Sequence, residues 1–520
     1  MFGFRRIKII TPLDSLDISS LKSSKALAKK HGSSKLMVST EDLRINLNEI
    51  SSYAMRVVAT LQKHHYEAYL VGGCIRDLLL GKKPKDFDVS TNATPEQIRQ
   101  IFVSNSRIIG RRFKIVHVLQ GKEIIEVTTF RSNKVAPSKP HTGRTRVKAE
   151  SGMLIRDNVY GKNIIEDSQR RDFTINALYL DSVKKVIYDF NGGLYDMQQG
   201  VIDIIGDPET RYSEDPVRMI RALRFCAKLG FKISRRTLSP IKKMASNLNA
   251  VSNARMFEEV NKLFLTGHGL QTFRTLRKYN IFELLFPAAG ELLDNQNYIN
   301  FVEYALGSSD KRYQEDKRNM PHFLYAVILW AVFQKRMFIS NQTYNSAVVL
   351  VPQNKLISGL LNDIITEQNR ITDMPMAVAD SIRSLWRMQL TLDDIENCNV
   401  DEIAARNIFR ASYDFLTLRG KFEPYLKSAV NFWEPYYIKS KELADKRKAK
   451  KEELILGRKA RKKEKLAQKK RAYEEKLASK KSKRKANEES FDDEANLSAK
   501  RKKQLEKARA WRAAMHLDVK

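Results

Sequence analysis

The spacing of hydrophobic residues changes along the chain and divides it into regions. From about residue 46 to about 205, short apolar runs of strand length alternate with helical stretches, for example at residues 68–71, 115–118 and 124–127. After about residue 205 the strand signals stop, and amphipathic helical patterns continue to about residue 432. The pattern predicts an α+β fold in which a head with a small mixed sheet, flanked by helices, precedes an all-α neck and body.

Length and charge narrow the class of protein. A chain of 520 residues is long enough for two or three domains. Its 93 Lys and Arg exceed its 60 Asp and Glu, which leaves a formal charge of +33 and predicts a polyanionic partner, nucleic acid before an anionic membrane surface. Cys74, Cys226 and Cys398 form no CxxC pair, so there is no zinc signature. The longest apolar run, 323–333, is about half of the ~20 residues that cross a bilayer. It predicts a buried helix and no integral membrane span.

Both ends of the chain lack regular patterning. Residues 1–45 are rich in Lys and Ser and are expected to form a poorly ordered basic extension. Residues 441–520 hold 29 Lys and Arg against 14 Asp and Glu and contain few aromatic or β-branched residues. Such a segment cannot bury enough surface to offset its entropy of ordering. We expect a basic, RNA-binding tail that is largely disordered, with mixed-sign runs that permit transient helix. A solubilising tail is the alternative.

The strongest local signal is the segment Leu70 to Asp77, in which an apolar run meets two glycines and then opens a helix. Gly72 and Gly73 allow backbone N–H groups to approach a phosphate closely. Arg76, just inside the helix, can add charge-assisted contacts to a triphosphate. Gly81 stands where the C-terminus of that helix would need a glycine.

Three acidic residues could hold metal ions. Asp86 and Asp88 flank Phe87 in an extended segment, so both carboxylates are expected on one face of a strand. Two carboxylates at that spacing repel each other unless a cation lies between them, and Mg²⁺ prefers such hard oxygen ligands. Glu126 is the only charge within residues 124–127 and is expected to be buried, which calls for a cation. An exposed edge position is the alternative for Glu126.

A second charged segment, residues 170–177, reads RRDFTINA. Its two arginines suit phosphate, Asp172 suits ribose hydroxyls or a metal ion, and Phe173 can anchor the segment. Taken alone, this octet could equally be the charged start of an ordinary helix.

Together these segments resemble the class II tRNA nucleotidyltransferase and bacterial poly(A) polymerase family of the polymerase-β-like superfamily. The first motif of that family is similar to LVGGCIRDLLLG followed by DFD, and its ribose-binding motif to RRDFTINA. Its neck motifs are similar to DFNGGLYDMQQGVIDIIGDP and EDPVRMIRALRF, and the resemblance runs from about residue 69 to 231 and more loosely to about 430. Cys74 and Ile75 stand where the family usually has Gly or Ala and Val.

The resemblance implies roles for individual residues. Asp86, Asp88 and Glu126 would bind two Mg²⁺ ions, with Mn²⁺ as a substitute, and Asp172 would join them as a catalytic residue. Asp215 and Arg218 would read the edge of the incoming base. The predicted nucleotide-binding residues are Gly72, Gly73, Arg76, Asp77, Arg171, Asp172, Asn176, Asp215, Arg218, Arg221 and Arg224.

The sequence around Asp215 favours the same placement. Asp215 suits an N-cap, Pro216 suits the first helical position, and Gly230 would close the helix. An apolar stripe would run beside a basic one on this helix, through Val217, Ile220 and Leu223 and through Arg218, Arg221, Arg224 and Lys228. A helix that is merely solvated by its arginines is the alternative.

Residues 108–118 indicate which branch of the family the chain resembles. They contain GRRF-x₃-H, which is similar to a signature of the poly(A) polymerase branch, and the basic tail favours the same branch. Nothing resembles the HD phosphohydrolase domain of some CCA-adding enzymes. The basic loop at 131–151 has no counterpart that we can align.

We therefore predict a nucleotidyltransferase head (46–205), a helical neck (206–275), a helical body (276–435) and a basic tail (436–520) after the extension at 1–45. The expected reaction is template-independent addition of AMP from ATP to RNA 3′ ends, with release of pyrophosphate, which promotes RNA turnover. Expected partners are ATP, RNA 3′ ends, the RNA-degradation machinery and an RNA chaperone. We expect a cytoplasmic monomer, with peripheral attachment to the inner membrane through the tail left open. A CCA-adding enzyme and a non-catalytic RNA-binding scaffold are the alternatives.

Overall fold

The computed structural model describes residues 17–110, 114–132, 160–345, 353–396, 398–489 and 499–515. Within these ranges the chain divides into two compact units. The first comprises residues 1–399 and 407–432, and the second residues 400–406 and 433–520.

One mixed sheet of eight strands forms the centre of the head, in the order β1-β8-β7-β2-β3-β6-β5-β4. Only β3 and β6 pair in parallel; the other neighbours are antiparallel. The strands are β1 (Leu36–Ser39), β2 (Ala68–Val71), β3 (Asp88–Thr91), β4 (Ser106–Ile109), β5 (Ile115–Gln120), β6 (Glu123–Thr129), β7 (Leu178–Asp181) and β8 (Val186–Asp189). A separate parallel pair joins β9 (Val201–Ile202) to β10 (Lys232–Ile233). The predicted α+β head is confirmed, with more strands than expected.

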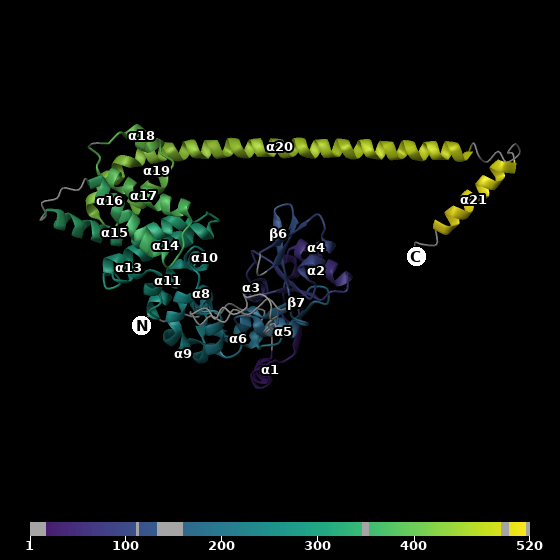
Figure 1. Cartoon of the computed structure of the whole chain (residues 1–520), viewed down its shortest axis with the longest axis horizontal. Coiled ribbons are helices and arrows are strands. Elements are labelled where there is room, and N and C mark those ends of the chain that lie inside the picture. Colours follow the sequence, from purple (N-terminus) through teal and green to yellow (C-terminus); the bar gives the residue numbers. More distant parts are fainter. Residues whose placement is uncertain are drawn as a thin grey trace, which may run out of the picture. The chain divides into compact units, whose positions relative to one another are not determined.

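Two hydrophobic layers sandwich this sheet, because successive strand residues point to opposite faces. On one face, Leu70 and Val89 belong to the main core. This face meets α2 (Ser52–Lys63), α3 (Gly73–Leu79) and α4 (Pro95–Ile101), as Figure 1 shows for α2 and α4. On the other face, Val71 and Tyr179 form a smaller core, which α5 (Ile164–Arg170) covers in part. The second face is the one that carries the charged residues of the site.

A single row of paired residues crosses the whole sheet on that second face. Its members, from one edge to the other, are Arg107, His117, Glu126, Asp88, Val71, Tyr179, Tyr188 and Met37. Directly paired residues project to the same side of a sheet. The row is therefore apolar and aromatic over its β2–β7–β8 half, and acidic where β3 meets β6.

The prediction for the N-terminal extension is wrong for residues 18–39. Helix α1 (Ile18–His31) starts at an N-cap, Asp17, whose carboxylate accepts from two backbone N–H groups, and it ends at Gly32 in the left-handed conformation. Strand β1 then pairs with β8 and becomes an edge of the sheet. Capping and tertiary packing outweigh the polar composition that suggested disorder.

From α6 onward the described residues are almost entirely helical, with the short strands β9 and β10 as the exceptions. Short helices come first: α6 (Gly193–Gln199), α7 (Pro208–Glu214), α8 (Val217–Leu229), α9 (Arg235–Met244), α10 (Asn253–Phe264), α11 (Gly269–Lys278), α12 (Phe282–Leu285) and α13 (Pro287–Gly290). The longer ones are α14 (Gln296–Gln314), α15 (Pro321–Asn345), α16 (Gln353–Asn369), α17 (Met376–Asp393) and α19 (Phe409–Arg419), with the short α18 (Val400–Ala405). Short 3₁₀ turns are η2 (Leu47–Glu49), η3 (Thr174–Asn176), η4 (Ala245–Ala250) and η5 (Pro424–Leu426). The all-α character predicted after residue 205 is confirmed, apart from the short β10.

Helix α15 contains the longest apolar run of the sequence. By length and composition the segment Pro321–Gln342 could cross a membrane, and half of its most apolar window is buried in the protein. Tyr325 to Trp330 lie in the main core, where Trp330 meets the rings of Phe333 and Trp386. The expectation of a buried helix in the core is met for this run.

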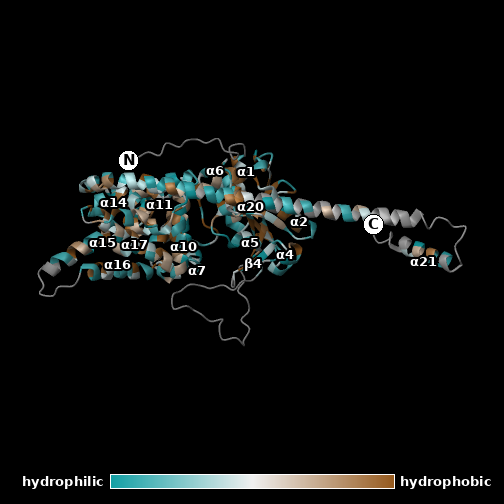
Figure 2. Cartoon of the chain, turned by 90° about the horizontal axis from the view of Figure 1, so that it is seen from above, coloured by the Kyte–Doolittle hydropathy of each residue, from teal (hydrophilic) through white to brown (hydrophobic). Residues whose placement is uncertain are grey.

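The basic C-terminal region is helical wherever it is described. Helix α20 (Lys427–Glu489) continues into the second unit, and α21 (Ala499–Met515) lies within it. Lys, Glu, Ala and Leu favour helix, and oppositely charged residues recur along α20. Leu454 and Leu456 are exposed, and Figure 2 shows the coloured parts of α20 mainly in hydrophilic tones. The described part of this region forms exposed helix, whereas a largely disordered tail with transient helix was expected.

Candidate active site

The paired glycines form a tight turn between β2 and α3. Gly72 has φ +81°, a left-handed value that favours glycine, and α3 begins at Gly73. A Cβ atom on Gly72 would lie 3.7 Å from Nη1 of Arg171, so this turn faces an arginine of the RRDFTINA segment. Gly81, with φ +65°, follows the end of α3 as predicted. The turn and the second charged segment therefore belong to one site.

Asp86, Asp88 and Glu126, here called the strand-edge carboxylates, meet at the β3–β6 pairing. Asp88 is in register with Glu126 on the neighbouring strand, and strands lie ~4.8 Å apart. Asp86 precedes β3 and lies outside the strand, two residues before Asp88. The pKa of Asp88 is raised to about 6, first because protein atoms around it displace water, and next because Glu126 and then Asp86 are negative; Arg171 counters in part. Glu126 and Asp86 are therefore close enough to Asp88 for their charges to raise its pKa.

The predicted burial of Glu126 is wrong. Its side chain is 49% exposed, with Nε2 of His117 3.5 Å from Oε1. Ile125 and Val127 point into the core, and strand alternation turns Glu126 outward to the face that carries Asp88. An exposed carboxylate does not need a cation, so burial gives no reason to place Glu126 in the site. Its position beside Asp88 does.

The strand-edge carboxylates suit a metal ion that also binds a substrate. Among the described residues, no group of three His, Cys, Asp or Glu side chains is arranged to hold a metal ion by itself. Mg²⁺ is usually bound by one or two carboxylates together with substrate phosphates, so a complete protein cage is not required. After the loss of water, the negative charges of Glu126 and Asp86 add to the raised pKa of Asp88, and a cation would relieve this part. The donor set therefore fits Mg²⁺ with a triphosphate.

Asp172 is the centre of a second cluster. Its Oδ2 accepts from Nε and Nη2 of Arg221 at 3.0 and 2.5 Å, and its Oδ1 accepts from the backbone of Phe173 and from Nδ2 of Asn176. Burial alone would raise the pKa of Asp172, but the charge and hydrogen bonds of Arg221 outweigh it and hold that pKa well below its usual range. Asp172 is therefore a fixed anion at neutral pH.

Arg76 supports this cluster from below. It is 3% exposed, and its Nη1 donates to Oδ1 of Asn176 at 2.6 Å while Nε and Nη2 donate to Oδ1 of Asp77. Arg76 and Asp77 thus hold Asn176, and through it Asp172. All these contacts are with protein groups, so the expected contact of Arg76 with a triphosphate gains no support from them.

Arg171 connects the two clusters. Its Nε donates to Oη of Tyr179 at 2.9 Å, its Nη2 donates to Oδ2 of Asp167 at 3.1 Å, and it lies over the Tyr179 ring at 5.1 Å. Burial would lower the pKa of Arg171, but Tyr179 and Asp167 raise it above its usual range. Tyr179 belongs to the cross-sheet row that contains Asp88. A permanent cation is therefore held between the strand-edge carboxylates and Asp172.

A pocket of about 270 Å³ brings five of the predicted nucleotide-binding residues together. Its lining is Arg171, Asp172, Asp215, Arg218, Arg221 and Arg255. In it, Oδ2 of Asp215 accepts from Nη2 of Arg255 at 2.9 Å. Its buried Oδ1 has no hydrogen-bond partner in the part of the chain that the structure describes. Asp215 therefore brings unused hydrogen-bond acceptor capacity to the pocket lining, on an oxygen that is itself buried.

The predicted N-cap role of Asp215 is wrong. Asp215 ends α7, and Pro216 precedes α8 without a side-chain cap. The carboxylate is turned to Arg255 instead of to the backbone N–H groups of α8. Arg218 donates from Nη1 to the carbonyl oxygen of Arg211 at 2.9 Å and to Oε2 of Glu214 at 3.2 Å. Both presumed base-reading side chains are thus held in place by protein partners.

The two predicted stripes of α8 are present. Val217, Ile220 and Leu223 are fully buried, and Gly230 ends the helix in the left-handed conformation. Phe225, on the same helix, lies under three guanidinium groups, with Arg76, Arg221 and Arg224 at 5.2, 5.6 and 4.5 Å from its ring centre. Burial, and then the charge of Arg221, lower the pKa of Arg224 to about 10. The stripe concentrates positive charge beside the pocket.

Two predicted features cannot be placed. Arg111 to Phe113 of the branch signature, and residues 133–151 of the basic loop, lie outside the described residues. His117, which ends the signature, is on β5 next to Glu126.

Sequence reasoning missed three residues that shape the site. Arg255 on α10, Asp167 on α5 and Tyr179 on β7 each contact a predicted residue, at 2.9 to 3.1 Å. Asp167 also accepts from Tyr179 at 2.8 Å. Their partners lie 4 to 40 residues away. Only Asp167, an acid four residues before Arg171, carried a local signal.

The head sheet with this acid and arginine cluster defines a nucleotidyltransferase of the polymerase-β-like kind. Family models agree: "Poly A polymerase head domain" matches residues 68–203, "Probable RNA and SrmB- binding site of polymerase A" matches 230–293, and "Polymerase A arginine-rich C-terminus" matches 355–509.

The sequence is 41% identical over 411 residues to poly(A) polymerase I of Escherichia coli, which covers 77% of this chain and 86% of that protein. The chain belongs to the bacterial poly(A) polymerase family. A CCA-adding enzyme of Lactobacillus helveticus is 36% identical over 228 residues, 44% of this chain and 53% of that one. The structure of the Bacillus stearothermophilus CCA-adding enzyme in complex with CTP shares the fold, with a TM-score of 0.50, 22% identity and coverage of 75% of this chain and 82% of that chain.

Proposed function

We propose that this enzyme transfers AMP from ATP to the 3′-hydroxyl of RNA without a template and releases pyrophosphate. The observation that carries the proposal is the in-register pairing of Asp88 with Glu126 near Arg171. Arg171 also lines the pocket that contains Asp172. A polynucleotide adenylyltransferase needs a metal site and a nucleotide pocket on one surface, and Arg171 belongs to both surroundings. Family membership supports the same reaction.

In this proposal the strand-edge carboxylates hold two Mg²⁺ ions, for which Mn²⁺ can substitute. Bound Mg²⁺ would supply charge neutralisation at the triphosphate and a lower pKa for the attacking RNA hydroxyl. The protein's own contribution is to fix the ligands: β3 and β6 hold Asp88 and Glu126 at one edge of the site. The Gly72–Gly73 turn leaves room for phosphate oxygens beside Arg171.

Adenine selection is assigned to the pocket around Asp215. The unpartnered Oδ1 of Asp215 would accept from the amino group of adenine, and Arg218 would donate to a ring nitrogen. Arg255 and Glu214 hold these two side chains before the nucleotide arrives, which lowers the cost of ordering them. Asp172, held by Arg221 and Asn176, is positioned for the ribose hydroxyls.

RNA would be held mainly through its phosphates. Within the region that matches the RNA-binding family model, a hollow of about 620 Å³ is lined in part by Arg274, Arg277 and Lys278. The basic helices α20 and α21 would add sequence-independent contacts. Truncation after residue 440 should weaken RNA binding and flatten its dependence on salt. An unchanged salt slope would reduce this region to a solubilising role.

The reaction is tested by giving the purified protein ATP or CTP together with either a tRNA that lacks its CCA end or a generic RNA oligomer. AMP incorporation on both RNAs is expected. Incorporation of CMP on the tRNA alone would identify a CCA-adding enzyme, the candidate favoured by the more distant relatives and by the shared fold. Absence of any transfer would support a non-catalytic RNA-binding scaffold.

In the cell, A-tails would mark RNA for 3′-exonucleases, and the RNA-degradation machinery and an RNA chaperone are the partners we propose. We also propose a cytoplasmic monomer, with the basic tail as the segment that would meet an anionic membrane. Co-sedimentation of the full chain and of the chain truncated after residue 440 with anionic vesicles tests the last point.

A further inference from the structure

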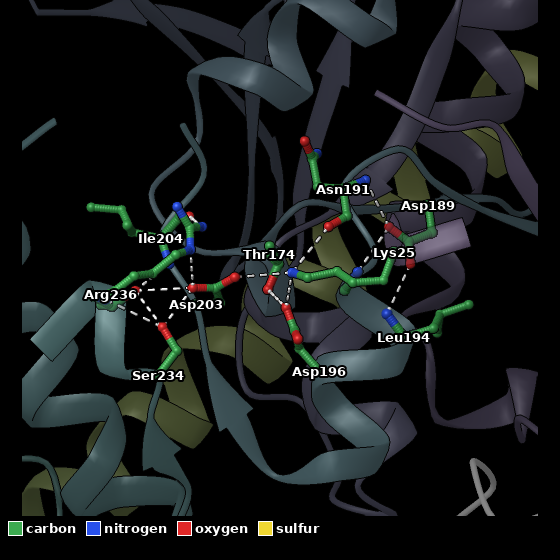
Figure 3. A network of polar contacts seen from close by, with 12 residues as sticks. Lys25, Thr174, Asp189, Asn191, Leu194, Asp196, Asp203, Ile204, Ser234 and Arg236 are labelled. Atoms are coloured by element: carbon green, nitrogen blue, oxygen red, sulfur yellow. Dashed lines mark hydrogen bonds and ion pairs between the residues drawn. The ribbon is translucent and has the colours of Figure 1, made fainter. Parts of the chain in front are cut away.

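Helix α1 packs against α6 and lies outside the motifs that suggested the enzyme class. Lys25, on α1, is 6% exposed. Its Nζ donates to Oδ2 of Asp196 at 2.5 Å, to Oδ2 of Asp203 at 3.1 Å and to the carbonyl oxygen of Asn191 at 3.4 Å. Figure 3 shows Lys25 reaching between the two carboxylates. Burying any one of these charged groups alone would cost much free energy, so the ammonium and the two carboxylates stabilise one another.

The same carboxylate of Asp196 also holds the ribose-binding segment. Oδ2 of Asp196 accepts from Oγ1 of Thr174 at 2.5 Å. Thr174 begins η3, the turn that follows Asp172 and Phe173. At the end of that turn Asn176 donates to Asp172. One oxygen atom therefore links α1 to the turn whose last residue, Asn176, contacts Asp172.

Asp203 anchors the other side of this segment. Its carbonyl oxygen accepts from the backbone N–H of Thr174, while its carboxylate Oδ1 accepts from Ser234 and from Nε of Arg236. The backbone of Asp172 accepts from Ile205, two residues further on. The two backbone hydrogen bonds fix the path of the chain at Asp172 and Thr174, in addition to the side-chain contacts of Asp172 with Arg221 and Asn176.

Two glycines make room for this arrangement. A Cβ atom on Gly192, which has φ +71°, would collide with the side chain and backbone of Lys25. A Cβ atom on Gly193 would collide with the carbonyl oxygen of Thr174. The Gly192–Gly193 pair thus permits α1 and η3 to approach the start of α6 at once.

We propose that Lys25 is a positioning residue of the nucleotide site: by joining Asp196 and Asp203 it holds the Thr174–Asn176 turn in the position that presents Asp172 to the nucleotide. The proposal rests on the proposed function, because it takes the Asp172 pocket as the ATP site. Lys25 touches no substrate itself. Its loss would let the turn move, which weakens ATP binding and leaves RNA contacts elsewhere intact.

The test compares Lys25→Met with Lys29→Met in the full-length protein. Lys29 is exposed on the same helix, so its replacement controls for loss of a positive charge from α1. In Lys25→Met we expect the KM for ATP and the Kd for ATP with Mg²⁺ to rise about tenfold, with the KM for RNA unchanged. Lys29→Met should match the unmodified enzyme in all three.

A double-mutant cycle tests the route. Thr174→Val cuts the link to Asp196 without changing a charge, so it should raise the KM for ATP as well. If both residues act through one path, the double variant should be little worse than the more severe single variant. Fully additive effects would overturn the proposed route through Asp196.

If Lys25→Met does not fold, the double variant Lys25→Met with Asp196→Asn is used in its place. It removes one buried charge of each sign, and a raised KM for ATP is again expected. A folded variant whose KM and Kd for ATP equal those of Lys29→Met would overturn the inference, while the unmodified enzyme still transfers AMP. Failure of the unmodified enzyme to transfer AMP would instead overturn the proposed function, so the two failures are distinct.

Discussion

Two clusters of carboxylates lie in the same head, and they differ in what neutralises them. Asp196 and Asp203 are buried and share the ammonium of Lys25, with Arg236 as a further partner of Asp203. The strand-edge carboxylates are not in direct ion-pair contact with an Arg or Lys within the described residues; Glu126 has only His117 nearby, and Arg171 acts on Asp88 from a distance. The first cluster is neutralised within the protein, whereas we propose that bound metal ions neutralise the second.

The difference separates structural from functional acids. Burying an acid pair is tolerable only if a cation and hydrogen bonds satisfy it, and a protein cation then becomes part of the fold. Acids that repel each other at an accessible edge cost stability, and that cost is retained where a reaction needs the charge. Removal of charge should therefore have opposite effects on stability in the two clusters.

The largest effect is expected on activity when the strand-edge carboxylates are neutralised. Asp86→Asn with Asp88→Asn should lower AMP transfer by ~10³-fold or more, because metal binding contributes several kcal/mol to such reactions. RNA affinity should stay the same. The melting temperature without metal should be unchanged or higher, because a repulsion is removed. Retained activity, or a clear loss of thermal stability, would contradict the distinction between the clusters.

The opposite change is expected at the buried cluster. Lys25→Met leaves two buried acids without their shared cation, and breaking a buried ion pair costs about 3–5 kcal/mol. The first unfolding transition in urea should move to lower concentration, whereas Lys29→Met should change it by less than about 0.5 kcal/mol. Equal midpoints for the two variants would show that the cluster is not part of the fold's stability.

The smallest effect is a dependence of stability on pH. Burial, partly opposed by Lys25, raises the pKa of Asp196 to about 6, from 3.8 in an unfolded chain. The folded state therefore binds the proton of Asp196 more tightly than the unfolded chain does. The resulting gain in unfolding free energy is full below pH 3.8 and is lost as the pH rises through 6. The pKa of Asp203 is lowered to about 2, so it stays ionised in this window.

Asp196→Asn should remove this contribution. The difference in unfolding free energy between the unmodified protein and the variant should decline from pH 4 to pH 6 and then level off. Urea unfolding at pH 4, 5, 6 and 7 measures it. The titration of Asp88 in the same range is common to both proteins and cancels. A constant difference across these pH values would mean that Asp196 does not titrate there.

The placement of Asp88 beside Glu126 was expected from the family resemblance, whereas local patterns in the sequence were enough to predict the glycine turn and the two stripes of α8. Each depends on residues a few positions apart, or on strands whose alternation fixes a face. The pairing of Asp172 with Arg221, and of Asp215 with Arg255, depends on tertiary contacts across about 40 to 50 residues. For that reason Arg255 was missed and Asp215 was taken for an N-cap.

The N-terminal segment was misjudged for a related reason. Composition alone suggested disorder for residues 1–45, since Lys and Ser dominate there. The value of Lys25 becomes visible only when Asp196 and Asp203, some 170 residues away, are in place to receive it. A buried cation cannot be told from a solvated one until its partners are known.

The crowding at Gly192 has a consequence for how relatives of this chain are read. The matching head model starts at residue 68 and so does not include Lys25. A chain with alanine at position 192, or with a different N-terminus, would keep every predicted catalytic residue and still lose the contact of Lys25 that supports the Thr174–Asn176 turn. An inventory of motifs would count such a protein as competent, although its weakness would lie in a segment that the inventory never inspects.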